Sequence, residues 1–300
     1  MATKSRTVGA RAMNYINQLK QRAEQTKSIL CVGMDPVLER IPLQGNPKEV
    51  ILKFYINILN ECKKQNIQPA IVKPNIAYFE QYGIEGLDAL KQLVEFCHNQ
   101  NIPVLCDAKR GDIGPTSAAY AKALFEVWQF DAITVNPWMG EDSVAPFLEY
   151  GKKGKGLYIL VRTSNPSAKE FQEQIAEGKR LYMHVAERLL QWNREGTCAV
   201  VGATAPNELE EIATFFVKRG KEIPFLIPGV GSQGGDLKAT VQALKNSGTD
   251  LRIHRINASS SINYAWEKTG NPNEYAGAAV EEIKKLNREI GFWEEKDTRQ

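Results

Sequence analysis

The chain has 300 residues, of which 43% are hydrophobic and 24% are charged, so it is long enough to bury a sizeable core. Its formal net charge of +3 is too small to indicate a nucleic-acid-binding protein from bulk electrostatics. Its apolar runs are far shorter than a membrane span, and its first 27 residues lack the apolar segment of a secretory signal. We therefore expect a cytoplasmic protein with no membrane or nucleic-acid partner.

Secondary structure is predicted to alternate along the chain. Residues 1–27 predict an amphipathic lead-in helix, and segments such as 47–65 and 85–100 carry apolar residues at helical spacing. A last helix is expected at 273–291. Between the helical segments lie short β-rich runs, which predict eight strands at 28–33, 69–74, 102–108, 131–136, 156–162, 198–203, 224–229 and 251–258.

Eight β-then-α units in a chain of this length favour an α/β protein of the (β/α)₈ TIM-barrel type. The near-continuous apolar strands are typical of a parallel sheet that is covered on both faces. A doubly wound open sheet is the alternative, but the first strand lacks the glycine fingerprint of that fold. We expect a single barrel domain at 28–290, preceded by the lead-in helix at 1–27 and followed by a tail at 291–300.

The cysteines and histidines give no sign of a metal site. The five cysteines are scattered, mostly within apolar runs, and no pair has metal-ligand spacing, so reduced core thiols are expected. The three histidines are isolated, and each is predicted to be structural or on the surface.

Charged and polar residues recur where the predicted strands end. In barrels of this type, catalytic groups come from the C-terminal ends of the strands. The first strand ends in Asp35, the second in Lys73, and the third in Asp107 and Lys109. Two lysines and two aspartates that converge on one barrel mouth indicate a functional site. The fourth and fifth strands add further polar residues, among them Asn136 and Ser164.

The segment "VLCDAKRGDIGPTSAAYAKALF" at 104–125 contains three of the charges that this interpretation depends on. Asp107 and Lys109 are two residues apart on a strand, so both side chains are predicted to point into the barrel. Asp112 follows a turn and must lie above the strand end, aimed either into its own site or outward. A buried ion pair with a helix-capping aspartate is the alternative, but it leaves the charges of the first two strands unexplained.

The glycine-rich segment "PGVGSQGGD" at 228–236 follows the seventh predicted strand. Backbone N–H groups in such a loop can bind a phosphate, and barrels often use the loops after strands seven and eight for this purpose. A tight turn that needs glycine for positive φ is the alternative.

The segment "DAKRGDI" at 107–113 carries the D-x-K-x-x-D-I signature of orotidine 5′-phosphate decarboxylases, and the chain resembles the longer bacterial-type branch of that family. The likeness also includes "CVGMDP", "IVKPN", "VNPWMGEDSVAPF", "VRTSNPSA" and "PGVGSQGGD". It implies decarboxylation of orotidine 5′-phosphate to UMP in de novo pyrimidine biosynthesis, without metal or organic cofactor, by a homodimer.

The resemblance also implies roles for individual residues. Lys109 would protonate C6 of the pyrimidine, Asp107 would lie beside the substrate carboxylate, and Lys73 would complete the charge array. Asp112 would be contributed across the dimer interface to the partner's site. The substrate-binding set would be Asp35 at the ribose, Ser164 at the pyrimidine, Gln233 between base and phosphate, and Thr116, Asn136, Pro228, Gly229, Ser259 and Ser260.

One position departs from the family pattern. The loop after strand eight normally supplies an arginine to the phosphate, but the segment "INASSSINYA" has Ser260 there, and Arg252 and Arg255 lie too early in the strand to replace it. We expect substrate binding to be weaker by about 2–3 kcal/mol, the scale of charged hydrogen bonds. Ser260→Arg should lower the Michaelis constant, unless another group already fills this role.

Two other functions stay open at this point. One is a sister barrel enzyme, a metal-assisted decarboxylase or aldolase acting on a sugar phosphate, which chelator treatment would distinguish. The other is a non-catalytic nucleotide-binding barrel that has lost activity together with the arginine. The intact set of two aspartates and two lysines argues against the second.

Overall fold

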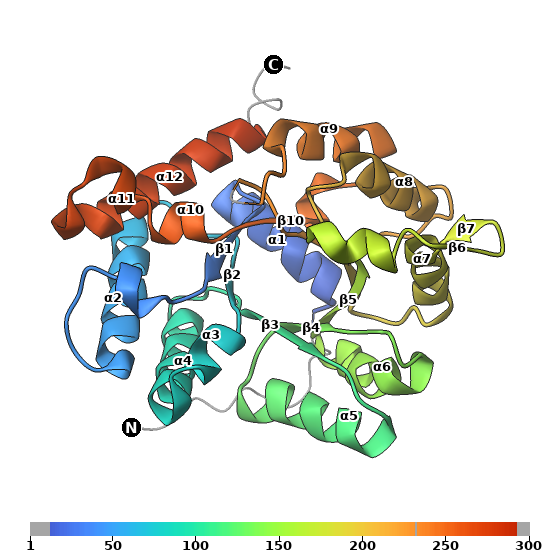
Figure 1. The fold of residues 1–300 in the computed structure, drawn as a ribbon, viewed down its shortest axis with the longest axis horizontal. Helices are drawn as coiled ribbons and strands as arrows, with labels where there is room; N and C mark the ends of the chain where they lie inside the picture. Colours follow the sequence, from blue (N-terminus) through green and yellow to red (C-terminus); the bar gives the residue numbers. More distant parts are fainter. Residues whose placement is uncertain (1–12, 232, 293–300) are drawn as a thin grey trace.

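The structure is a computed structural model that describes residues 13–231 and 233–292. Within these residues, an eight-stranded parallel sheet has the order β2-β1-β10-β9-β8-β5-β4-β3 (Figure 1). Each strand overlaps one of the eight predicted segments. The strands are β1 (Leu30–Met34), β2 (Ile71–Pro74), β3 (Leu105–Arg110), β4 (Ala132–Val135), β5 (Gly156–Arg162), β8 (Thr197–Val201), β9 (Phe225–Ile227) and β10 (Arg255–Ala258).

The sheet closes into a barrel between its two end strands, β2 and β3. Parallel bridges join Val72 to Val104 and Asn75 to Asp107, and the Val72 amide donates to the Pro103 carbonyl at 3.1 Å. The predicted (β/α)₈ barrel is therefore confirmed. The closure also places the end of β2 beside the end of β3, where two of the predicted site residues lie.

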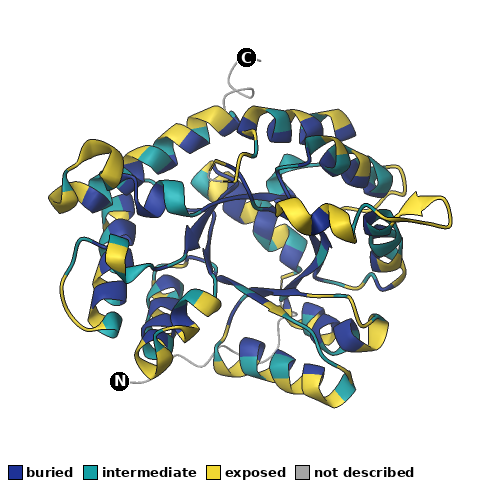
Figure 2. Cartoon of the chain, in the orientation of Figure 1, coloured by how far each residue is buried: buried dark blue, intermediate teal, exposed yellow. Residues whose placement is uncertain are grey.

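Helices surround the barrel and turn their buried faces toward it (Figure 2). The helix α2 shows how the sequence defines such an element: the Asn46 side chain accepts from the Glu49 amide, and Pro47 occupies the first turn. The longer outer helices are α2 (Pro47–Lys64), α4 (Gly83–Asn99), α5 (Gly114–Lys122), α6 (Glu141–Leu148), α7 (Leu181–Gln191), α8 (Pro206–Val217), α9 (Leu237–Ser247) and α12 (Tyr275–Ile290). The short helices are α3 (Ala77–Glu80), α10 (Ser260–Asn263) and α11 (Trp266–Thr269).

The lead-in helix α1 (Tyr15–Thr26) packs across the N-terminal end of the barrel. Tyr15 and Leu19 join the apolar side chains of the barrel interior in one cluster. A Cβ atom on Gly156, at the start of β5, would overlap the Tyr15 ring, so this contact requires glycine. The helix closes one end of the barrel and leaves the opposite end for a binding site. Residues 1–12 of the predicted lead-in lie outside the described residues, as do residues 293–300 of the predicted tail.

The long connection after β5 contains additional structure before α7. A 3₁₀ helix (Pro166–Glu170) and a hairpin of β6 (Ile175–Ala176) and β7 (Lys179–Arg180) precede α7. All five cysteines are buried, as expected. In the part of the chain that the structure describes, no helix combines the length and apolar character needed to span a membrane.

Candidate active site

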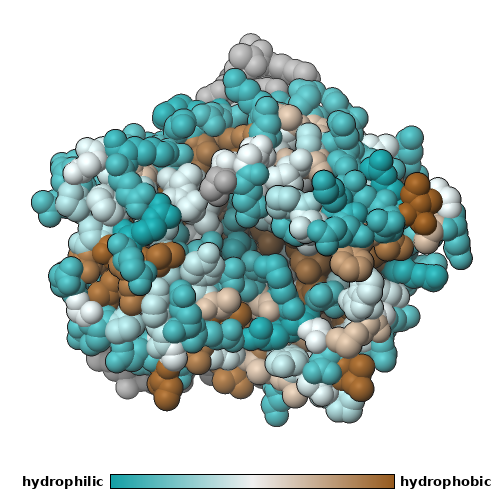
Figure 3. Space-filling view, in the orientation of Figure 1, coloured by the Kyte–Doolittle hydropathy of each residue, from teal (hydrophilic) through white to brown (hydrophobic). Residues whose placement is uncertain are grey.

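A cavity of about 500 Å³ opens at the C-terminal ends of the barrel strands, within the size range of small-molecule sites. The space-filling view shows the surface hollowed at the centre of this face (Figure 3). Most of the predicted site residues line this cavity, although they come from six different strand ends. They are Asp35, Lys73, Asp107, Lys109, Ser164, Pro228, Gly229, Gln233, Ser259 and Ser260.

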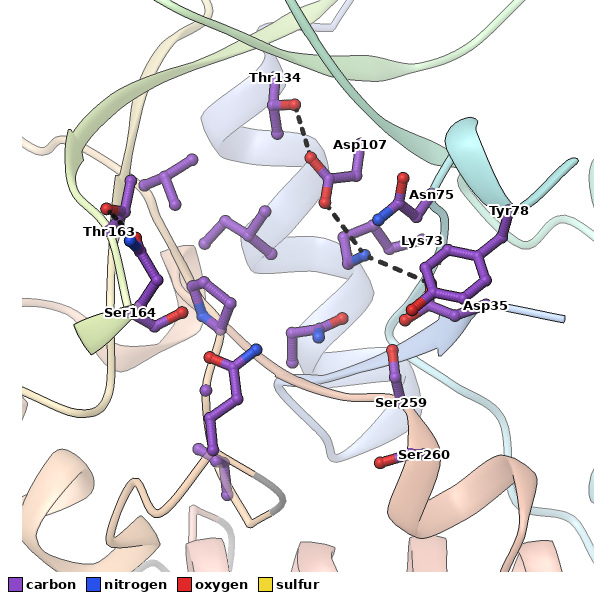
Figure 4. A pocket seen from close by; sticks show the side chains of 18 of the residues that line it. Asp35, Lys73, Asn75, Tyr78, Asp107, Thr134, Thr163, Ser164, Ser259 and Ser260 are labelled. Atoms are coloured by element: carbon purple, nitrogen blue, oxygen red, sulfur yellow. Dashed lines mark hydrogen bonds and ion pairs between the residues drawn. The ribbon is translucent and has the colours of Figure 1, made fainter. Parts of the chain in front are cut away.

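Lys73, at the end of β2, lies at the centre of an array of four charges, of which Figure 4 shows Asp35, Lys73 and Asp107. Its Nζ lies 3.6 Å from Oδ2 of Asp107 and 4.0 Å from Oδ1 of Asp35. Lys109 completes the array, with its Nζ 2.7 Å from both carboxylate oxygens of Asp107. We use the name charge array for Asp35, Lys73, Asp107 and Lys109. Because the charges alternate in sign, each stabilises its neighbour in the ionised form.

The surroundings of the charge array keep its two buried central groups ionised. Burial by itself lowers the pKa of Lys73, but the carboxylates of Asp35 and Asp107 outweigh it and hold that pKa above its ordinary value. Burial by itself raises the pKa of Asp107, but Lys73, Lys109 and a hydrogen bond from Thr134 hold it below its ordinary value. Both residues therefore carry full charges at neutral pH.

The backbone at Lys109 differs from the regular strand that was predicted. Lys109 has a φ of +45°, and the β3–β4 ladder shifts register between Cys106 and Arg110. The Lys109 amide donates to Oγ1 of Thr134 at 2.9 Å, and this hydroxyl donates to Oδ1 of Asp107 at 2.8 Å. The β-bulge thus holds the ammonium over the carboxylate, and it leaves the Lys109 side chain half-exposed toward the cavity.

Asp35 presents an acceptor to the cavity. Its Oδ1 is buried and has no hydrogen-bond partner among the described residues, although Lys73 lies 4.0 Å away. Its backbone carbonyl accepts a hydrogen bond from the Tyr264 hydroxyl at 2.9 Å, which fixes the loop after β1 to the segment after β10. The Asp35 side chain as a whole is 21% exposed and lines the cavity, so its accessible part can accept from a donor such as a ligand hydroxyl group.

The loops after β5 and β9 pack tightly against each other through glycine. Gly229 has a φ of +102°, and a Cβ atom there would lie 2.8 Å from Cβ of Ser164 and 3.2 Å from Oε1 of Gln233. Gly231 and Gly234 also have positive φ values, and Val230 pairs with Gly235 in an isolated bridge. The glycine-rich loop therefore lines the cavity with backbone and a glutamine side chain.

The segment after β10 brings Ser259 and Ser260 to the cavity without any arginine. A Cβ atom on Gly33 of β1 would overlap Oγ of Ser259, so that glycine makes room for the serine. Oγ of Ser259 is buried and has no partner among the described residues. Arg255 lies at the other end of the strand, where it donates to the Leu19 and His254 carbonyls, and Arg252 pairs with Asp250. Neither arginine lines the cavity.

Three predicted site residues do not line the cavity of their own chain. Asp112 is partly buried, and its carboxylate accepts from the Ile113 amide at 2.8 Å. Thr116 lies exposed in the first turn of α5, and Asn136 is exposed and accepts from the Trp138 amide at 3.0 Å. Asp112 and Thr116 follow β3, and Asn136 follows β4.

Several cavity residues were not singled out from the sequence. Asn75 is two residues after Lys73, and Thr134 is two residues before Asn136, so strand alternation was a usable signal for both. The same signal was available for Asn257, which lies within β10 two residues before Ser259. Arg40, Tyr78 and Tyr264 carried no comparable signal, because their place depends on how the loops after β1, β2 and β10 fold.

The carboxylates that line the cavity are arranged as ion pairs with lysine and not as a set of metal ligands. Within the described residues, no group of three histidine, cysteine, aspartate or glutamate side chains is placed to hold a metal ion. Asp35 and Asp107, the carboxylates that line the cavity, both lie against the Lys73 ammonium. Such an arrangement can bind and polarise a charged organic ligand.

Comparisons with known proteins extend over most of the chain. Residues 28–268 match the model of the family described as orotidine 5′-phosphate decarboxylase / HUMPS. The chain is 39% identical over 282 residues to the orotidine 5′-phosphate decarboxylase of Halobacterium salinarum, covering 92% of this chain and 99% of that protein. The structure of Leishmania donovani OMP decarboxylase is similar, with a TM-score of 0.72 and 32% identity over 92% of this chain and 99% of that one. Leishmania donovani UMP synthase gives a TM-score of 0.73 at 34% identity over 92% of this chain, which spans 57% of that longer chain.

Proposed function

Because the chain belongs to the orotidine 5′-phosphate decarboxylase / HUMPS family, we propose that it decarboxylates orotidine 5′-phosphate to UMP in de novo pyrimidine biosynthesis. The observation that carries the proposal is the charge array at the barrel mouth. Lys73 is held between Asp35 and Asp107, and Lys109 lies over Asp107, all in one cavity of suitable size.

Loss of carbon dioxide leaves an electron pair at C6 of the pyrimidine, and the charge array supplies what this carbanion needs. The ammonium of Lys109 stabilises the developing charge and transfers a proton to C6. Asp107 lies beside the departing carboxylate, and the buried Lys73 holds Asp107 in place and ionised. Because these charges are fixed before the reaction, they require little reorganisation while it proceeds.

Magnitudes indicate which of these effects dominates. Repulsion between Asp107 and a substrate carboxylate about 4 Å away is about 4 kcal/mol at an effective dielectric of 20. Large enzymatic accelerations require up to roughly 23 kcal/mol. Ground-state repulsion is therefore a minor contribution, and stabilisation of the carbanion by Lys109 carries most of the acceleration.

The rest of the cavity binds the nucleotide. We assign Asp35, whose partly exposed carboxylate lines the cavity, to the ribose hydroxyls, and Ser164 to the pyrimidine. Gln233 bridges base and phosphate, while Pro228, Gly229, Ser259 and Ser260 surround the phosphate end. Asn136 remains a candidate substrate contact, although it does not line the cavity in this structure.

We assign Asp112 and Thr116 to the site of a partner subunit in a homodimer. Both lie outside their own cavity, and exposed apolar side chains lie near them in the chain and after β4: Ile113, Trp138 (75% exposed) and Met139. An apolar surface around a carboxylate that faces away from its own site supports burial against a second copy. We place the enzyme in the cytoplasm, where the five free thiols would stay reduced.

The metal-assisted reaction of a sister barrel on a sugar phosphate is the second candidate. Its chemistry needs several carboxylates free to bind a divalent ion, whereas here Asp35 and Asp107 face a lysine. A non-catalytic nucleotide-binding barrel would not need to retain the costly buried charges of the array. The decarboxylase is therefore favoured over both.

The test is to follow the loss of orotidine 5′-phosphate absorbance with purified protein in the presence of a chelator. We expect wild-type activity to persist and Lys109→Ala to lose at least a thousandfold in kcat. Lys152→Ala, which removes an exposed lysine before β5, is the matched control and should behave as wild type. Activity abolished by the chelator, or retained by Lys109→Ala, would contradict the proposal.

A further inference from the structure

The cavity holds one cation that the charge array does not use. Among the described residues, its cationic lining consists of Lys73, Lys109 and Arg40. The two lysines are paired with Asp107, whereas Arg40 lies apart from them, at the end of the 3₁₀ helix Leu38–Arg40 that follows β1. A phosphate that is bound without a nearby cation loses its hydration at a large cost in free energy. Because Ser260 supplies no such cation, the position of Arg40 in the cavity becomes important.

Arg40 lies on the same side of the cavity as Ser260, although the two residues are far apart in sequence. The strands β1 and β10 pair in parallel, with Val32 opposite Ala258, so the loops that follow them are neighbours. The Arg40 guanidinium stacks 3.8 Å from the centroid of the Tyr264 ring, and the Tyr264 amide donates to the Ser260 carbonyl at 3.0 Å. Arg40 is therefore held over the helical turn that Ser260 begins.

One edge of the Arg40 guanidinium is bound by Glu267, and the other edge is free to bind a ligand. Nε and Nη2 donate to the two carboxylate oxygens of Glu267, at 2.8 and 2.6 Å. Nη1 has no hydrogen-bond partner among the described residues. The pair is partly exposed, 41% for Arg40 and 39% for Glu267, and exposed ion pairs contribute little net stability. Arg40 can therefore exchange Glu267 for a phosphate dianion at a small cost in free energy.

We propose that Arg40 supplies the cationic contact to the substrate phosphate that Ser260 cannot make. This inference rests on the proposed function, and it replaces the contact from the loop after β10 with one from the loop after β1. Arg162 and Arg110, the arginines that end β5 and β3, do not line the cavity and point instead to Glu173 and Glu80. A guanidinium that is already oriented by a ring and a carboxylate can bind phosphate oxygens with little loss of side-chain entropy.

The test combines Arg40→Ala, Glu267→Gln and Ser260→Arg with steady-state kinetics. Arg40→Ala should raise KM for orotidine 5′-phosphate about 10- to 100-fold, the range expected for charge-assisted hydrogen bonds. Glu267→Gln removes the competing carboxylate and should lower KM. Ser260→Arg should restore KM in the Arg40→Ala background, and change it far less in the wild type. A purely structural role for the ion pair would instead make Arg40→Ala and Glu267→Gln change KM in the same direction.

Controls separate this inference from the proposed function. Arg219→Ala removes an arginine that stacks on Phe215 outside the cavity and should leave KM unchanged. The binding of UMP and of uridine, measured by calorimetry, tests Arg40 even without turnover. UMP should bind more weakly to Arg40→Ala than to the wild type, whereas uridine, which lacks the phosphate, should bind equally to both proteins. A KM within twofold of wild type for a folded Arg40→Ala protein would overturn the inference alone. A wild-type protein that binds UMP through Arg40 but releases no carbon dioxide would instead overturn the proposed function, and failure to bind UMP would overturn both.

Discussion

Replacing Asp107 with asparagine tests whether the charge array is held together by electrostatics. The substitution keeps the shape and the oxygen that accepts from Thr134, but it removes the charge 3.6 Å from the buried Lys73 ammonium. At an effective dielectric of 20, that attraction is about 5 kcal/mol, and loss of one partner from a buried pair typically costs about 3–5 kcal/mol. Asp35, 4.0 Å from the same ammonium, compensates in part. We therefore expect Asp107→Asn to lower the free energy of unfolding by about 3 kcal/mol at neutral pH.

Urea unfolding of a double-mutant cycle isolates the pair. Lys73→Met alone leaves two carboxylates without their shared ammonium and should cost a similar amount, whereas Asp107→Asn combined with Lys73→Met removes both partners. The double variant should be less destabilised than the sum of the single variants by about 2 kcal/mol or more. Asp88→Asn, at an exposed pair with Lys48, is the control and should leave the urea midpoint essentially unchanged. A coupling energy below about 0.5 kcal/mol, or an Asp107→Asn protein as stable as wild type, would refute the electrostatic account.

Three further predictions concern other parts of the molecule. His254 is fully buried and accepts a hydrogen bond from the Phe225 amide, and burial lowers its pKa from 6.5 to about 3. As the pH falls below 6.5, the unfolded chain therefore binds a proton at this residue that the folded chain does not bind. This group alone should cost about 1.4 kcal/mol of stability between pH 7.5 and 5.5, a loss that His254→Asn should abolish in urea titrations at both pH values. If Asp112 serves the partner's site, the Asp112→Ala and Lys109→Ala homodimers should each be inactive. Mixing the two variants should restore up to about a quarter of wild-type activity, because each mixed dimer contains one intact site. No recovery of activity after subunit exchange would contradict a shared site. Gly156→Ala should lower unfolding stability by about 1–3 kcal/mol, because the new methyl group overlaps the Tyr15 ring, and an unchanged urea midpoint would show that α1 does not pack as described.

The barrel was predictable because its signals are local. Each strand is a short apolar run bounded by glycine, proline or charged residues, and outer helices such as α2 and α9 carry both apolar periodicity and a side-chain N-cap. The charges of the array were predictable for the same reason, since Asp35, Lys73 and Asp107 end strands whose C-terminal ends must meet in a closed barrel. The β-bulge at Lys109 was not predictable, because its positive φ depends on the hydroxyl of Thr134 on the neighbouring strand.

Arg40 shows what local signals miss. It is the last residue of a short 3₁₀ helix, and nothing within its own segment relates it to a serine 220 positions later in the chain. The relation arises only when β1 pairs with β10 and Tyr264 donates to the Asp35 carbonyl, which brings the two loops together. A motif comparison at position 260 therefore records a lost arginine, whereas the folded cavity still contains a guanidinium at that end. A phosphate site is defined by where cations converge in space, and a barrel lets the loop after its first strand supply the charge that the loop after its last strand lacks.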